Sequence, residues 1–159
     1  MTSKLIKIKE KIKAAAQLSS RNPEDITLVA VSKIHTAQTI IEVLKEGQRI
    51  FGENRVQEAA QKWPALKEQF SGVVLHLIGP LQSNKVRQAL SLFDVIETVD
   101  RPKLARAIAR ISMETGEVCD IYIQVNTGLE SQKAGVAPEQ ADALIALCQD
   151  ELKLSVKGV

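Results

Sequence analysis

A lysine at the end of an apolar segment is the residue of this sequence best placed for chemistry. Residues 27–32 are mostly apolar and rich in β-branched side chains, which predicts a buried β-strand, and Lys33 follows directly. In α/β folds, ligands bind where the strands reach their carboxyl ends. Burial disfavours the charged form of a lysine, and a neutral amine attacks carbonyl carbons to form Schiff bases. Lys33 is therefore a candidate for covalent chemistry with a carbonyl compound. The alternative is a lysine that extends into solvent as the chain reaches the surface.

The composition is that of an ordinary globular domain and argues against several classes of function. The chain has 159 residues, enough for one domain with a core, and its net charge of +2 is too small to indicate a nucleic-acid or membrane partner. Its two histidines come without a cysteine or histidine cluster, so a metal site is not indicated. Cys119 and Cys148 lie in apolar surroundings without a CxxC motif, which is typical of buried thiols in a reducing compartment. We expect a cytoplasmic protein, since no apolar run approaches the length of a membrane span.

Strands and helices alternate regularly along the chain. After 27–32, strands are expected at 49–52, 73–78, 94–98, 118–126 and 154–159, with helices between them and one more at 3–19. Pro64 is expected to kink or break the helix that follows the second strand. The alternation requires a parallel sheet with right-handed crossovers, either an open doubly wound sheet or a (β/α)8 barrel. Because no GxGxxG follows the first strand and no P-loop occurs, a standard nucleotide-binding sheet is less favoured.

The sequence contains too few strand–helix units for a complete barrel. A barrel usually needs roughly 200–250 residues, whereas this chain holds about six units and stops within the apolar segment 154–159. A core strand at a chain end leaves backbone and side chains without partners. We therefore expect a fragment of an α/β barrel. A full-length barrel is expected to be a monomer, and an unclosed one is expected to associate with another chain or to swap segments.

Six groups of residues share their order and approximate spacing with one protein family. They are VAVSK at 29–33, FGEN at 51–54 with VQE at 56–58, HLIGPLQSNK at 76–85, VDR at 99–101, IQVN at 123–126 and KAGV at 133–136. Each motif alone is weak, but the ordered set, which covers the chain from about residue 26 onward, resembles the YggS-type pyridoxal 5′-phosphate homeostasis proteins.

The resemblance implies a single (β/α)8 TIM barrel like the N-terminal domain of bacterial alanine racemases. Residues 1–159 would form this one domain, with its C-terminal portion missing. It implies pyridoxal 5′-phosphate held as a Schiff base on Lys33, in a protein that carries the cofactor without catalysis and affects amino-acid and keto-acid balance. It also places Asn54 and His76 beside the cofactor. The alternatives are that Asn54 caps the following helix and that His76 is a hydrogen-bonded core residue.

The resemblance points less strongly to two further segments. Residues 82–85 open a helix at the same end of the sheet, and Lys133 lies in a polar loop there. Ordinary capping and solvated lysines are the alternatives. The family's phosphate-binding segments belong to the last two strand–helix units, which this sequence does not contain. A fragment that no longer binds the cofactor is therefore one of the expected possibilities.

Two other functions remain open at this stage. A racemase or decarboxylase of the same fold needs a second acid/base group across the cofactor ring from the lysine. The only tyrosine, Tyr122, lies in the fifth predicted strand and is expected in the core. An interaction module without a small-molecule role would instead cover its sheet edges with a second copy of the chain.

Overall fold

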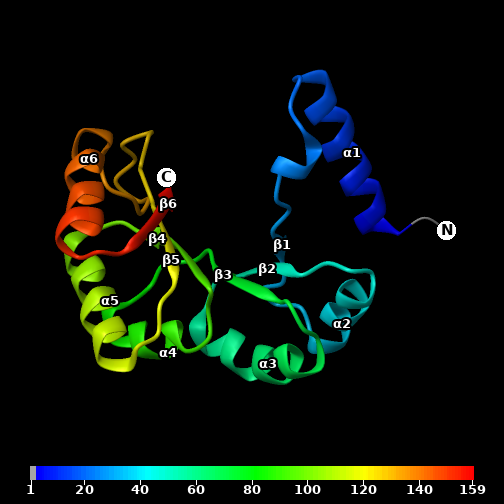
Figure 1. Cartoon of the computed structure of the whole chain (residues 1–159), viewed down its shortest axis with the longest axis horizontal. Helices are drawn as coiled ribbons and strands as arrows, with labels where there is room; N and C mark the ends of the chain where they lie inside the picture. The colour runs from blue at the N-terminus through cyan, green and yellow to red at the C-terminus, as the bar shows by residue number, and fades with distance from the viewer. Residues whose placement is uncertain (1–2) are drawn as a thin grey trace.

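Six parallel strands form one sheet whose spatial order follows the order of the chain (Figure 1). The computed structural model describes residues 3–159. Every strand pairs in parallel with the next one along the sequence. The strands are β1 (Ala30–Val31), β2 (Ile50–Glu53), β3 (Val74–Leu77), β4 (Val95–Val99), β5 (Asp120–Ile123) and β6 (Ser155–Gly158).

This sequential order decides between the two architectures left open by the sequence. A doubly wound sheet reverses its strand order at a switch point. Here the order runs from β1 to β6 without reversal, as it does around a barrel, and within residues 3–159 β1 and β6 are the two edges of the sheet. The structure thus confirms a barrel-type sheet made of six strands.

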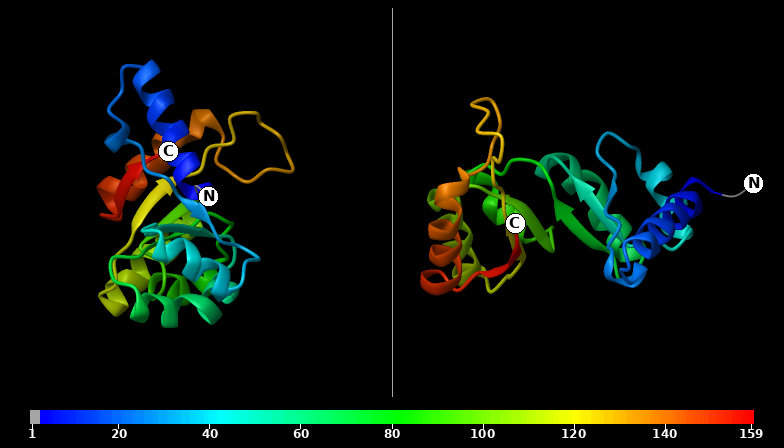
Figure 2. Two further views of the ribbon diagram at one scale, coloured as in Figure 1. Left: turned by 90° about the vertical axis from the view of Figure 1, so that its right-hand side faces the viewer. Right: turned by 90° about the horizontal axis from the view of Figure 1, so that it is seen from above.

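Helices cover the outer, convex face of this curved sheet (Figures 1 and 2). Helix α1 stands apart at the β1 end, where it packs mainly against the short turn η1. No helix within the described residues is both long enough and apolar enough to cross a membrane. The helical segments are α1 (Lys4–Leu18), η1 (Pro23–Asp25), α2 (Ala37–Lys45), α3 (Val56–Gln69), η2 (Ser83–Lys85), α4 (Val86–Leu90), α5 (Pro102–Thr115), α6 (Pro138–Ala146) and the π-helical turn η3 (Leu147–Glu151).

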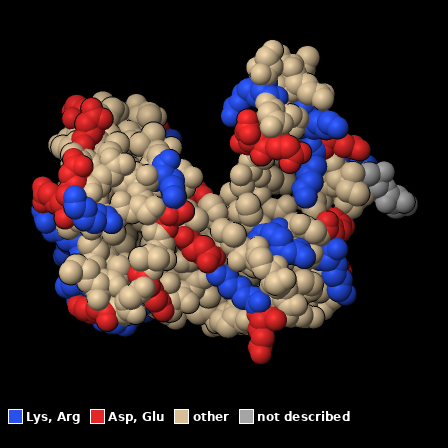
Figure 3. Space-filling view, in the orientation of Figure 1, with Lys and Arg blue, Asp and Glu red and all other residues tan. Residues whose placement is uncertain are grey.

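The two faces of the sheet differ sharply in burial because side chains alternate along each strand. Leu75 and Leu77 of β3 are fully buried in the core against the helices, whereas His76 between them faces the opposite, concave side. On that side lies a hollow of about 680 Å³. The space-filling view shows the molecule notched between α1 and the β6 end (Figure 3). The core therefore lies between sheet and helices, and the inner face is open.

Pro64 does not break its helix, although a break was one of the two outcomes expected for it. Helix α3 continues through it from Val56 to Gln69. An internal proline removes one helical hydrogen bond and crowds the preceding turn. The residues on either side outweigh that cost, because Trp63 and Leu66 are both buried in the core and fix the helix against the sheet. Strand β1 also differs from expectation, since it pairs over only two residues of the predicted segment 27–32.

The loops that follow β2 and β3 touch at Gly79. A Cβ atom at this position would lie 2.2 Å from the backbone oxygen of Asn54. Because the obstacle is backbone, it cannot move aside as a flexible side chain would. Only glycine therefore allows these two loops to approach so closely, and that approach fixes the carboxyl ends of β2 and β3 relative to each other.

We expect Gly79→Ala to lower the free energy of unfolding by about 2 kcal/mol, the usual scale for overpacking a closely packed site. Urea titration measures this loss. Gly128→Ala is the matched control, since its added Cβ would meet only the mobile carboxylate of Glu130 at 3.1 Å. Equal stability of the two variants would contradict the claim that the close contact between the loops requires glycine at position 79.

Candidate functional site

The register of the first three strands brings the predicted site residues to neighbouring strand ends. Val31 of β1 pairs with Gly52 of β2, and Gly52 pairs with His76 of β3. Lys33 and Asn54 follow the paired residues Val31 and Gly52 by two positions each, just past the ends of β1 and β2. His76 lies within β3 and lines the inner hollow. Lys33 and Asn54 therefore follow two neighbouring strand ends, and His76 lies on the next strand along.

Lys33 itself is exposed, so the partial burial expected for it is wrong. The reason is its position at the edge of the sheet: β1 ends at Val31, and Lys33 lies in a tight turn, residues 32–35, which we call the Lys33 turn. Ser32 still pairs with β2, donating its backbone N–H to the oxygen of Gly52 at 3.0 Å. Its side chain points to the outer side, toward α3. The chain leaves the sheet at the next residue.

His76 is hydrogen-bonded, as one of the two alternatives predicted, and its contact with a cofactor stays a prediction. It is 9 % exposed, and its Nδ1 lies 2.6 Å from Oε1 of Glu97 on β4. It is thus a hydrogen-bonded histidine, and it also lines the inner hollow together with Glu97 and Tyr122. Tyr122 was expected in the core and is not: it is half-buried on the inner face, because Ile121 and Ile123 on either side of it occupy the core.

Asn54 does not cap the helix that follows it. The N-cap of α3 is Arg55, and it makes no side-chain capping bond. Asn54 is half-buried and borders a second hollow of about 540 Å³, which Gln82 and Lys85 also line. Lys133, by contrast, is an exposed lysine paired with Glu130 three residues before it. Within the described residues, His76 and Asn54 thus line different hollows, and Lys33 borders neither of these two.

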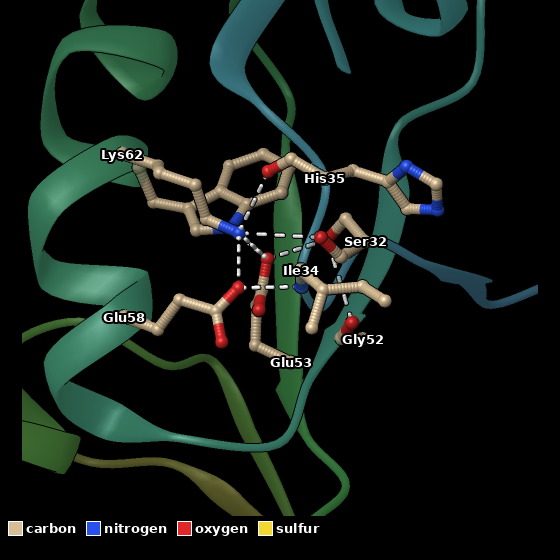
Figure 4. Close-up of polar contacts among 8 residues, drawn as sticks. Ser32, Ile34, His35, Gly52, Glu53, Glu58 and Lys62 are labelled. Atoms are coloured by element: carbon tan, nitrogen blue, oxygen red, sulfur yellow. Dashed lines mark hydrogen bonds and ion pairs between the residues drawn. The ribbon is translucent and has the colours of Figure 1, made fainter. Parts of the chain in front are cut away.

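A buried carboxylate lies directly behind the Lys33 turn. Glu53, the last residue of β2, is completely buried on the outer face of the sheet. Its Oε1 accepts hydrogen bonds from the Ser32 hydroxyl at 2.7 Å and from the Trp63 indole at 3.0 Å, and it lies 2.9 Å from Nζ of Lys62 (Figure 4). Its Oε2 has no hydrogen-bond partner. A buried carboxylate requires such compensation, so this cluster ties α3 to the ends of β1 and β2.

Two further contacts reach the backbone of the Lys33 turn from α3. Oε1 of Glu58 accepts the N–H of Ile34 at 2.6 Å, and Nζ of Lys62 donates to the carbonyl oxygens of Ser32 and His35 at 3.2 and 3.3 Å. Glu58 and Lys62 also pair with each other at 2.9 Å, one helical turn apart. All these bonds lie on the α3 side of the turn, whereas the His35 ring points away from them (Figure 4).

The charges of this cluster stabilise one another. The hydrogen bond from Lys62, and after it the Ile34 N–H, hold the pKa of Glu58 below its ordinary value. Burial alone would lower the pKa of Lys62, but its hydrogen bonds to Glu53 and Glu58 outweigh burial and raise it. Lys62 is thus held as a cation between two carboxylates.

The two cysteines are buried free thiols, as expected. Burial, with a smaller contribution from Asp120, raises the pKa of Cys119 to about 12, and burial raises that of Cys148 to about 11. Neither thiol is therefore ionised at neutral pH, and the described residues contain no cluster of metal-binding side chains. The chemistry available at the strand ends is that of an amine, an amide and an imidazole.

The cluster behind the turn was not predicted, although the sequence contains two signals for it. In β2 the outward positions are Phe51 and Glu53, which places a carboxylate on the face that must pack against a helix. In α3, Glu58 and Lys62 have the spacing of an ion pair on one helix face. The carboxylate of β2 and the ion pair of α3 come together only because of the way α3 packs against the sheet.

Comparison with known proteins places this arrangement in a family. The family model described as alanine racemase, N-terminal domain, matches residues 4–159. The pyridoxal phosphate homeostasis protein of Escherichia coli K12 is 38% identical over 156 residues, which cover 98% of this chain and 67% of that protein. This chain belongs to the pyridoxal phosphate homeostasis protein family. It spans about two thirds of the length of that relative.

Solved structures agree with this assignment to the homeostasis protein family. PipY from Synechococcus elongatus PCC7942, with PLP bound, is 38% identical and superposes with a TM-score of 0.78 over 93% of this chain and 68% of that one. Alanine racemase from Clostridium difficile 630 superposes with a TM-score of 0.70 over 96% of this chain and 38% of its own. At 18% identity, the racemase shows only that the fold is shared.

We expect Lys62→Met to destabilise this family member by about 3 kcal/mol, because it leaves the buried Glu53 carboxylate without its counter-ion. Lys67→Met on the same helix is the matched control. The Lys67–Asp94 pair has side chains 29% and 45% exposed, against 12% and 0% for Lys62–Glu53. Loss of such a solvated pair costs below about 1 kcal/mol. Denaturant titration of both variants measures the difference, and equal losses would contradict the importance assigned to the buried pair.

Proposed function

We propose that this protein binds pyridoxal 5′-phosphate through a Schiff base on Lys33 and carries the cofactor without catalysing a reaction. The observation that carries the proposal is the position of Lys33. It is an amine just past the carboxyl end of β1, which pairs with the strand that Asn54 follows, in a chain 38% identical to a protein whose structure holds PLP. Carboxyl ends of parallel strands are where barrel proteins bind ligands.

The residues at the strand ends fit such a ligand. The exposed Lys33 amine is open to an incoming aldehyde, and condensation would form a carbon–nitrogen double bond and release one water molecule. The Asn54 amide can both donate and accept hydrogen bonds to polar ring substituents. The His76 ring is oriented by Glu97, so it can present its other nitrogen inside the hollow. When bound, the cofactor would supply an electrophilic aldehyde and an electron-withdrawing ring.

A carrier role is favoured over a catalytic one. The pyridoxal phosphate homeostasis protein of Escherichia coli K12 is 38% identical over the aligned residues, whereas the likeness to alanine racemase, at 18% identity, lies in the fold alone. The proposal includes a cytoplasmic location, in keeping with the free thiols of Cys119 and Cys148. The cofactor is the one binding partner that the proposal names.

One observation favours a second candidate, a racemase-like enzyme. Tyr122 faces the inner hollow instead of the core, and β5 is four strands from β1, so this tyrosine stands on the other side of the sheet's curve from Lys33. Racemisation needs an acid/base group on each face of the substrate. Conversion of L-alanine to its enantiomer by the cofactor-loaded chain, and its loss in Tyr122→Phe, would support this candidate over the carrier.

The proposal predicts that mixing the chain with pyridoxal phosphate produces the absorbance band of a protonated Schiff base. We expect Lys33→Ala to abolish the band, because the amine that forms the bond is gone. Lys103→Ala, which removes an exposed lysine on α5, should leave it unchanged. An undiminished band in Lys33→Ala would overturn the assignment of Lys33, and no band in the unmodified chain would overturn cofactor binding.

A further inference from the structure

Two side chains of α3 bind the backbone of the turn that carries Lys33. Glu58 binds the N–H of Ile34, and Lys62 binds the carbonyl oxygens of Ser32 and His35. Three backbone groups of a four-residue turn are thereby bound by one charged pair. We call Glu58 and Lys62 the turn clamp. These hydrogen bonds go to the residues around Lys33, which lies in the middle of the turn, and not to Lys33 itself.

The backbone of this turn is strained, so it requires such support. Ile34 has a φ of 62°, in the left-handed region that β-branched residues avoid. Ile34 is 85% exposed, so burial of its side chain does not offset the energy of the strain. A strained conformation persists only where the surrounding structure enforces it, and such positions cluster at functional sites. The turn is closed by its own hydrogen bond, from the His35 N–H to the Ser32 carbonyl oxygen at 3.1 Å, and the hydrogen bonds of the turn clamp add to it.

The clamp is itself anchored in the core. Lys62 lies 2.9 Å from the buried Oε1 of Glu53, and the same oxygen accepts the hydroxyl of Ser32, the first residue of the turn. Trp63, the neighbour of Lys62 on α3, also donates to this oxygen. These contacts fix the turn relative to the buried Glu53 carboxylate. A displacement of α3 would therefore displace the turn with it.

We propose that Glu58 and Lys62 are positioning residues that hold the Lys33 turn so that the Lys33 amine stands at the strand ends beside Asn54, ready for an aldehyde. This inference rests on the proposed function, because it assigns a purpose to the placement of Lys33. The clamp acts through the backbone, since both of its charged groups are engaged by backbone atoms and by each other on the outer side of the sheet. Lys33 takes no part in these bonds and is exposed.

Glu58→Ala tests the clamp with little risk to folding, because Glu58 lies near the surface of α3, with its side chain 27% exposed. We expect the Ile34 amide to exchange with solvent at least about tenfold faster, the factor that corresponds to one hydrogen bond of ordinary net strength. NMR hydrogen exchange measures this without any cofactor. Glu58→Gln, which keeps an acceptor oxygen, should restore part of the protection, and Glu68→Ala on the same helix should change nothing. Unchanged exchange in Glu58→Ala would overturn the clamp.

The second measurement is the rate at which the Schiff-base absorbance appears with pyridoxal phosphate. In Glu58→Ala we expect it to fall at least about tenfold, since misplacing a reacting group by about an ångström has effects of this order. The melting temperature should remain close to that of the unmodified chain. Ile34→Gly removes the backbone strain and should keep or raise the melting temperature while it slows the same rate. A rate equal to that of the unmodified chain in both variants would overturn the positioning role.

The two proposals fail in different ways. If the unmodified chain forms no Schiff base, the proposed function is wrong, and the positioning of Lys33 for an aldehyde is wrong with it, even where exchange of the Ile34 amide confirms that the clamp holds the turn. If the unmodified chain forms a Schiff base on Lys33 and Glu58→Ala forms it equally fast, cofactor binding stands and the positioning role is wrong.

Discussion

The buried carboxylate of Glu53 is the constraint on which the arrangement of the first two strands depends. A fully buried negative charge is costly unless it is paired and hydrogen-bonded. The protein compensates Glu53 with a hydroxyl from β1's end, and with an ammonium and an indole from α3. These three donors converge on one oxygen only if strand end, helix and turn are correctly fitted. The electrostatic requirement of one side chain thus selects a single packing of α3 against the sheet.

The same cluster separates two tasks that meet at the end of β1. On the outer side of the sheet, Glu58 and Lys62 bind the backbone of the turn. Their hydrogen bonds offset the backbone strain of Ile34, which is of the order of 1–3 kcal/mol for such a residue. His76 lines the hollow on the inner side, while Lys33 and Asn54 follow the carboxyl ends of β1 and β2. Charge that stabilises the fold is therefore kept away from the amine that is proposed to react. An aldehyde can approach Lys33 without disturbing the pair that supports it.

Much of this site could be predicted from the sequence, because its residues follow strands in a regular order. The apolar segment before Lys33, the position of Asn54 after the second strand and the alternation around His76 each identify a residue at or near a carboxyl edge. What could not be predicted depends on tertiary contacts. The exposure of Lys33 follows from β1 being an edge strand that ends at Val31, and Tyr122 faces the hollow because its two neighbours occupy the core. The exposure of Lys33 is not visible in local patterning, whereas the alternation of Ile121, Tyr122 and Ile123 does indicate that Tyr122 faces away from its neighbours.

The most direct test of this account is to find which lysine the cofactor marks. Incubation of the chain with pyridoxal phosphate, reduction with borohydride and peptide mass mapping fix the linkage as a stable amine on the residue that formed it. The account predicts a pyridoxyl group on Lys33 at substoichiometric cofactor, ahead of every other exposed lysine. A label found first on Lys85 or Lys133, or spread evenly over the surface lysines, would contradict it, because the turn would then give Lys33 no advantage over an ordinary solvated amine.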